Sequence, residues 1–169
     1  MPRLFGVGLA LVGAACDRAP EQTGRVRALV ARPPKDTIRF DAPARARHCS
    51  DSTRSSGGLL LQGAREGNGV AVWLRARDSL VGGQWPLLQR GDTVSPRGAT
   101  VGVRYVLSEV AHGLTLDSGA VELRQTGGVI TVVVRGTGLE VSAAGRVTLD
   151  ASFDAVPLEA DTVSCRWRP

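Results

Sequence analysis

The chain has 169 residues, of which 43% are apolar, and this length and composition predict one domain with short extensions. Its formal net charge of +5 comes from twenty Arg and one Lys against 16 acidic residues. A basic protein can bind nucleic acid, but this sequence has no basic helix, zinc module or RNA-binding motif. We therefore expect no nucleic-acid partner.

The N-terminal residues have the pattern of a secretory signal peptide. Met1–Arg3 is basic, Leu4–Val12 is apolar and uncharged, and Gly13–Ala15 is a run of small residues that ends at Cys16. The apolar stretch is too short to cross a bilayer, which needs about 20 residues. We expect residues 1–15 to be a signal peptide with a helical apolar part.

The Cys directly after this run resembles the junction in bacterial lipoprotein signals. In that family the Cys becomes the first mature residue and carries the lipid, which implies that Cys16 is the lipidation site. The family favours Leu three positions before the Cys, where this chain has Gly13. Residues 13–15 also suit ordinary signal peptidase, so secretion without an anchor is the alternative. The resemblance implies a membrane-anchored protein of the bacterial cell envelope that faces the periplasm or the exterior.

The number of cysteines fits this interpretation. An odd number of Cys is unusual in an exported protein, but three are accounted for if Cys16 is acylated and Cys49 pairs with Cys165. Two separate buried thiols are the alternative. No Cys-x-x-Cys occurs, and His48 and His112 lack ligand-like spacing, so we expect no metal and no cofactor.

Residues 16–36 contain Pro20, Pro33 and Pro34 together with mixed charges, which predicts a flexible tether between the lipidated Cys and the domain. The domain is expected over 37–169. Its expected strands are, in chain order, 37–41 and 44–50 (a pair, or one strand bent at Pro43), 58–64, 70–77, a short edge strand at Pro86, 100–110, 113–117, 119–125, 128–136, 145–156 and 161–167.

Alternation of apolar and polar residues supports these strands. In 145–156, Val147, Leu149 and Phe153 share one face, and Asp150 and Asp154 lie on the other, as in a half-buried antiparallel strand. The glycine-containing segments 66–69, 125–128 and 142–145 predict tight turns, and 66–69 includes an Asn-Gly pair. The sequence predicts an all-β domain, an antiparallel β-sandwich or flattened β-barrel of about nine strands. This layout resembles the many small, uncharacterised bacterial lipoproteins with a single all-β mature domain, and no site residues follow from that resemblance.

One face of the domain is a candidate binding surface. If 70–77 pairs with 100–110, the outward-facing Trp73, Arg75, Arg77 and Arg104 share one side. An aromatic ring among arginines can bind sugars or anionic groups, so the expected partners are an envelope glycan, an anionic lipid or a protein. The alternative is that arginine stems only cover Trp73.

No catalytic residues stand out. No Gly-x-Ser-x-Gly motif occurs, and Arg90-Gly91-Asp92 matches an adhesion tripeptide too short to carry a prediction. The expected function is therefore a non-enzymatic, lipid-anchored binding or structural module. A calyx-like carrier of a small ligand is the first alternative, which requires an interior cavity of several hundred Å³. A hydrolase-type enzyme is the second, which requires clustered titratable residues in a pocket.

Overall fold

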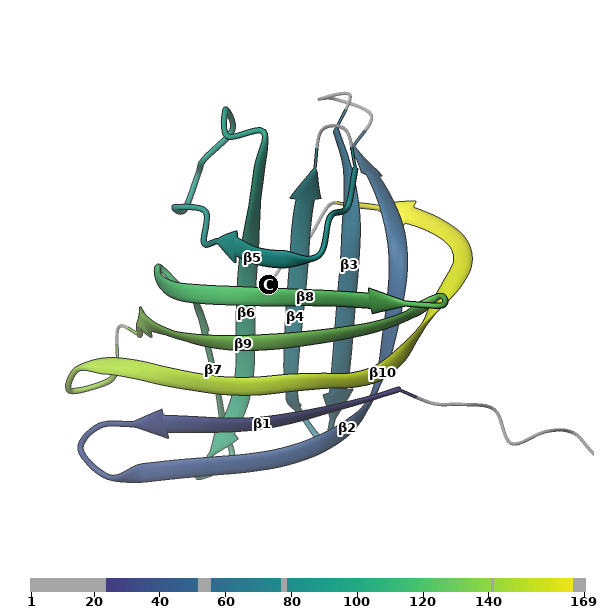
Figure 1. Ribbon diagram of the computed structural model, residues 1–169. Coiled ribbons are helices and arrows are strands. Elements are labelled where there is room, and N and C mark those ends of the chain that lie inside the picture. Colours follow the sequence, from purple (N-terminus) through teal and green to yellow (C-terminus); the bar gives the residue numbers. More distant parts are fainter. Residues whose placement is uncertain (1–23, 52–55, 77–78, 141, 166–169) are drawn as a thin grey trace, which may run out of the picture.

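The computed structural model describes residues 24–51, 56–76, 79–140 and 142–165, and these residues form ten β-strands (Figure 1). The predicted signal peptide and Cys16 lie outside the described residues. The strands are β1 (Gly24–Arg32), β2 (Asp36–Asp51), β3 (Ser56–Arg65), β4 (Asn68–Ala76), β5 (Gly83–Pro86), β6 (Arg97–Leu107), β7 (Val110–Thr115), β8 (Ser118–Thr126), β9 (Val129–Leu139) and β10 (Arg146–Ser164).

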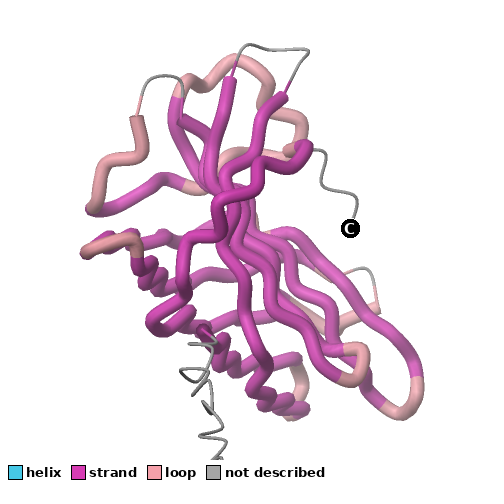
Figure 2. The backbone as a smooth tube through the Cα atoms, turned by 90° about the vertical axis from the view of Figure 1, so that its right-hand side faces the viewer, coloured by secondary structure: helices cyan, strands magenta, loops and turns pink. Residues whose placement is uncertain are grey.

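All ten strands belong to one sheet, in the order β5-β8-β9-β10-β1-β2-β3-β4-β6-β7. The sheet folds over itself, so that β8, β9, β10 and β1 run across β3, β4 and β6 at a steep angle (Figure 1). The same two layers are seen from the side in Figure 2. Their inner faces carry the core, whose largest fully buried side chains are Trp85, Tyr105 and Phe153. The predicted all-β architecture is confirmed, in the form of two layers that pack nearly orthogonally.

Strands β2 and β10 connect the two layers. The first part of β10 pairs with β1 and β9, and the part from Leu158 to Ser164 pairs in parallel with β2. Between these parts the register shifts after Phe153, and Ala155 has a φ of 49°. Such a bulge bends a strand and increases its twist. The backbone of Gly24, at the start of β1, packs directly on Val156, where no side chain would fit.

The N-terminal boundary of the domain differs from the prediction. The predicted tether over 16–36 is wrong from residue 24 onward, because Gly24–Arg32 forms β1 between β10 and β2. Val26, Ala28 and Val30 alternate with outward-facing residues and are buried. The prolines at 33 and 34 lie in the turn to β2, and β2 continues through Pro43 as a single strand. Tertiary pairing thus turns a segment that resembles a linker into a central strand.

Two-residue turns with positive φ join several strands. Gly127 and Gly128, in a predicted turn, have φ of 56° and 79° between β8 and β9. The predicted β3–β4 hairpin is also confirmed, but its turn residues are Glu66 and Gly67, two positions before the Asn-Gly pair at 68 and 69. Asn68 instead opens β4, and its side-chain Oδ1 accepts a hydrogen bond from the Val106 N–H at 2.9 Å.

The predicted disulfide between Cys49 and Cys165 is confirmed, with their Cα atoms 4.9 Å apart. Both cysteines are buried with Leu60 in a small apolar cluster, against which Trp73 and Val163 pack. This satellite cluster is separate from the main core.

Candidate functional site

The pairing of two strands on which the predicted binding face depends is present in the structure. Strand β4 pairs with β6, with Trp73 opposite Thr100 and Gly69 opposite Arg104. Because alternate residues share a face, Trp73 and Arg104 lie on the same outer side of the sheet. Arg104 is exposed and Trp73 is half-buried. Arg77 lies outside the described residues.

Arg75 does not have the predicted role of an exposed binding residue, because only 5% of it is exposed. Its guanidinium lies over the Trp73 ring at 5.1 Å and donates hydrogen bonds to the backbone carbonyls of Asp92 and Ser95, at 2.8 and 3.1 Å. Arg75 thus anchors the loop between β5 and β6. The contacts of Arg75 and Trp73 therefore fit the alternative interpretation, in which an arginine covers the tryptophan.

Asp92, the last residue of the adhesion-like tripeptide, is also engaged within the protein. Its carboxylate accepts hydrogen bonds from the Val94 and Ser95 N–H groups at 3.0 and 2.9 Å and from the Ser95 hydroxyl at 2.6 Å. The Ser95 hydrogen bonds lower the pKa of Asp92 below its ordinary value. These contacts organise the loop that Arg75 holds.

A hollow of about 460 Å³ surrounds Arg104 on the outer face of β3, β4, β6 and β7. Its floor is formed by residues with little or no side chain, namely Ala64, Gly69, Ala71, Gly102, Ala111 and Gly113. Strand register brings them together, because Ala71 lies opposite Gly102 and Arg104 lies between Gly69 and Gly113. The sequence pattern predicted Arg104 as a binding residue but did not predict the hollow, because its small residues come from four strands.

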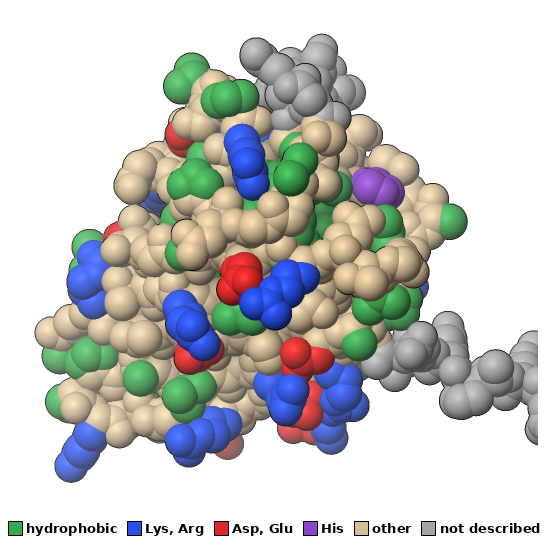
Figure 3. Space-filling view, in the orientation of Figure 1, with side chains coloured by type: hydrophobic (Ala, Val, Ile, Leu, Met, Phe, Trp, Pro, Cys, Tyr) green, Lys and Arg blue, Asp and Glu red, His purple; other side chains and the backbone are tan. Residues whose placement is uncertain are grey.

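A second hollow, of about 760 Å³, lies on the outer face of β9, β10, β1 and β2. Arg27, Arg39 and Arg135 line it together with Asp41 and Asp150. Basic and acidic side chains are intermixed on this side of the molecule (Figure 3). Arg135 pairs with Asp150 at 3.6 Å, Arg27 with Asp154 and Asp41 with Arg25. Among the described charged residues that line this hollow, only Arg39 has no ion pair with a described residue.

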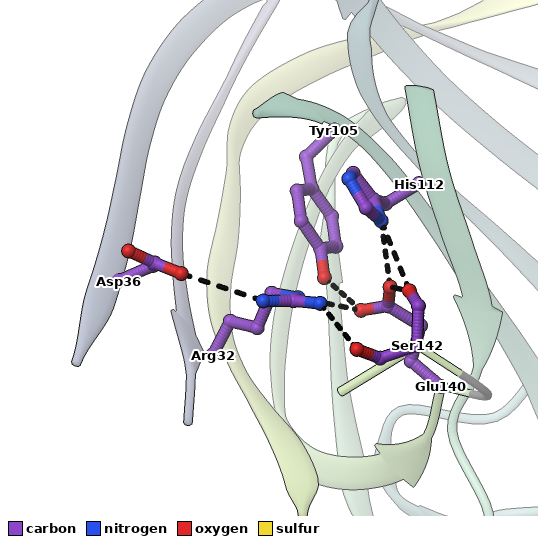
Figure 4. A network of polar contacts seen from close by, with 6 residues as sticks. All are labelled: Arg32, Asp36, Tyr105, His112, Glu140 and Ser142. Atoms are coloured by element: carbon purple, nitrogen blue, oxygen red, sulfur yellow. Dashed lines mark hydrogen bonds and ion pairs between the residues drawn. The ribbon is translucent and has the colours of Figure 1, made fainter. Parts of the chain in front are cut away.

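The most extensive polar network was not predicted from the sequence. Glu140, directly after β9, accepts hydrogen bonds from Tyr105 and Ser142, and it contacts His112 Nδ1 at 2.6 Å and Arg32 Nε at 3.2 Å (Figure 4). Burial would raise the pKa of Glu140, but the hydrogen bonds from Ser142, Tyr105, His112 and Arg32 lower it to about 2. The carboxylate is therefore ionised at neutral pH.

Arg32 extends the network to the β1–β2 turn. Its guanidinium lies 3.4 Å from Asp36 and donates to the backbone carbonyl of Ser142 at 2.7 Å. The Tyr105 ring stacks on the His112 ring with centroids 5.3 Å apart. The network thus joins side chains from β1, β6, β7 and the β9–β10 connection.

Although a serine, a histidine and a glutamate meet here, their geometry differs from a hydrolytic triad. In a triad, one histidine nitrogen faces the serine and the other faces the carboxylate. Here Nδ1 of His112 faces both Glu140 and Ser142, and the Ser142 hydroxyl donates directly to the carboxylate. The serine proton is thus directed to Glu140, and the arrangement suits a structural hub.

Comparisons with protein-family models, curated protein sequences and solved structures found no match. Within the described ranges, no helix is long and apolar enough to span a membrane. The same part of the chain contains no group of three or more His, Cys, Asp or Glu residues placed to hold a metal ion.

Proposed function

We propose that this chain is exported, is anchored in a bacterial membrane through a lipid on Cys16, and acts as a non-enzymatic binding or structural module of the cell envelope. The observation that carries the proposal is the Cys49–Cys165 disulfide. Structural disulfides persist in oxidising compartments such as the periplasm and are rare in the cytosol. The bond also uses two of the three cysteines, so Cys16 is the remaining one, directly after a signal-like segment.

The outer faces of the sheet support a binding role more than the interior does. Both hollows of several hundred Å³ described above lie on outer faces, while the inner faces are filled by fully buried side chains such as Trp85 and Phe153. The carrier alternative, which needs an interior cavity, gains no support from these hollows. The contacts of Glu140 likewise favour structure over hydrolysis.

The start of β1 limits how far an anchored domain can extend from the membrane. Seven residues, 17–23, separate Cys16 from Gly24. A chain of seven residues spans at most about 25 Å when fully extended. If Cys16 carries the lipid, the domain lies close to the bilayer surface, with the start of β1 and Val156 of β10 at the tethered end.

The proposal is tested by expressing the full-length chain and its Cys16→Ala variant in a bacterial host. We expect the wild type in the membrane fraction, with acyl mass on Cys16 by mass spectrometry, and the variant in the soluble fraction. A Cys49→Ala/Cys165→Ala double variant is the control and retains the acyl mass. An unmodified Cys16 in the mature wild-type protein would refute the anchor.

A further inference from the structure

We infer that the hollow around Arg104 is a binding site for an acidic sugar, with Arg104 holding the carboxylate. The inference deepens the proposed binding role by naming a ligand class, and it does not depend on the lipid anchor. It rests on the charge of the hollow, on the donors that surround it and on the shape of its floor.

Among the described residues that line the hollow, Arg104 is an unpaired positive charge and none is Asp or Glu. Arg104 has no ion pair or hydrogen bond with any residue that the structure describes. Other exposed arginines, such as Arg25 and Arg27, pair with carboxylates. His112 also lines the hollow, but its Nδ1 contacts Glu140. An unpaired guanidinium can bind a carboxylate through two parallel hydrogen bonds.

The amide side chains in the lining offer donors rather than acceptors. Gln62 Oε1 accepts from Arg47 Nη2 at 3.3 Å, and Asn68 Oδ1 accepts from the Val106 N–H at 2.9 Å. Both amide oxygens therefore already accept a hydrogen bond, whereas the amide N–H groups can donate to a ligand. Asn68 Nδ2 makes one long contact, 3.5 Å to the Glu66 carbonyl. A ligand that matches this set is rich in acceptor oxygens.

The size and floor of the hollow suit a sugar ring better than a simple ion. A volume of about 460 Å³ lies within the usual range of small-molecule sites, about 300–1,000 Å³. At Ala71, Gly102 and Gly113 the floor consists of backbone and one methyl group, because these neighbouring residues carry little or no side chain. The C–H face of a pyranose can lie on such a surface while its carboxylate and hydroxyls reach Arg104, Gln62 and Asn68.

The test is calorimetric titration of the full-length chain, purified in detergent, with a galacturonate disaccharide, the neutral galactose disaccharide and inorganic phosphate. We expect the acidic disaccharide to bind more tightly than the other two probes. Arg104→Ala should weaken its binding at least about tenfold, the usual effect of losing a charge-assisted hydrogen bond. Arg104→Lys should weaken it less, because lysine keeps the charge but cannot bind the carboxylate through two nitrogens.

Two further variants complete the test. Ala71→Leu places a larger side chain on the floor and should weaken binding with Arg104 unchanged. Arg39→Ala removes an exposed arginine that has no ion pair with a described residue and lines the other hollow, so it is the matched control and should bind like wild type. Equal affinity of Arg104→Ala and wild type, no binding of the acidic disaccharide, or equal affinity for phosphate would each overturn the inference. The membrane-fraction experiment is independent of all three outcomes.

Discussion

At the scale of single residues, Glu140 joins both layers of the sheet through one carboxylate. Its partners come from β1, β6, β7 and the β9–β10 connection, and they lie up to 108 positions away in the sequence. The carboxylate side chain is 5% exposed, and that of Arg32 is 12% exposed. A buried charge with several hydrogen bonds is costly to leave without its partners.

Replacing Glu140 with Gln should therefore lower the free energy of unfolding at pH 7 by about 3 kcal/mol, since it leaves the Arg32 guanidinium buried beside a neutral amide. Urea unfolding measures the change. The matched control is Glu122→Gln, because Glu122 pairs with Arg124 at the surface, where such pairs contribute about 0–1 kcal/mol. Equal losses in the two variants would contradict a special role for the network.

The same carboxylate predicts how stability depends on pH. The pKa of Glu140 is about 2 in the folded protein, against an ordinary value of 4.5. Because the folded-state pKa is the lower one, the contribution is complete above about pH 4.5 and is lost as the pH falls toward 2. We expect the stability difference between wild type and Glu140→Gln to shrink across this interval in urea unfolding. A difference that stays constant from pH 5 to 2.5 would refute this assignment.

At the scale of elements, the bulge in β10 allows one strand to serve both layers. Before the bulge β10 pairs with β1 and β9. Directly after it, Val156 and Pro157 still pair with β9, and from Leu158 onward β10 pairs with β2. Ala155 is exposed and has a φ of 49°, a left-handed conformation that costs an L-residue roughly 1–2 kcal/mol. Glycine adopts this conformation without that cost.

Ala155→Gly should consequently leave the fold intact and raise the free energy of unfolding by up to about 1 kcal/mol. Ala155→Val should lower it by at least about 1 kcal/mol, because a β-branched side chain tolerates positive φ poorly. Thermal and urea unfolding of both variants test the difference in sign. Because the Ala155 side chain is exposed, both substitutions change the buried apolar area little, and the backbone conformation accounts for the difference in stability. A valine variant as stable as the glycine variant would show that the bulge does not hold this conformation.

At the scale of the whole molecule, the disulfide links the far end of β2 to the residue after β10. It joins positions that are 116 apart in the sequence. A cross-link over so long a loop restricts the unfolded chain strongly, by about 4–5 kcal/mol in the chain-entropy model. The satellite cluster of Leu60 and Trp73 packs around the bond on the outside of the sheet.

We expect the Cys49→Ala/Cys165→Ala variant to unfold with a free energy lower by about 2–5 kcal/mol. Urea unfolding of the wild type under oxidising and reducing conditions gives the same comparison without mutation. Cys16→Ala is the control and should have the stability of the wild type, since Cys16 takes no part in the disulfide. An unchanged unfolding midpoint after reduction would show that the bond is not a structural one.

Local sequence patterns predicted the all-β class and most strand positions, and the number of cysteines favoured a Cys49–Cys165 disulfide over two separate thiols. The alternation of apolar and polar residues along a strand, as in Val147 and Leu149 against Asp150, is a local property of the sequence. It indicates a strand whichever way the strands are arranged in the sheet. The folded structure was needed to show that residues 24–32 form a central strand, that Arg75 is buried under a loop, and that Glu140 is a hub. Each of these depends on partners distant in sequence: β10 beside β1, Asp92 and Ser95 over Arg75, and Arg32 near Glu140. Burial and hydrogen bonding of a residue depend on which distant segments pack against it. A local pattern of apolar and polar residues contains no information about those distant segments.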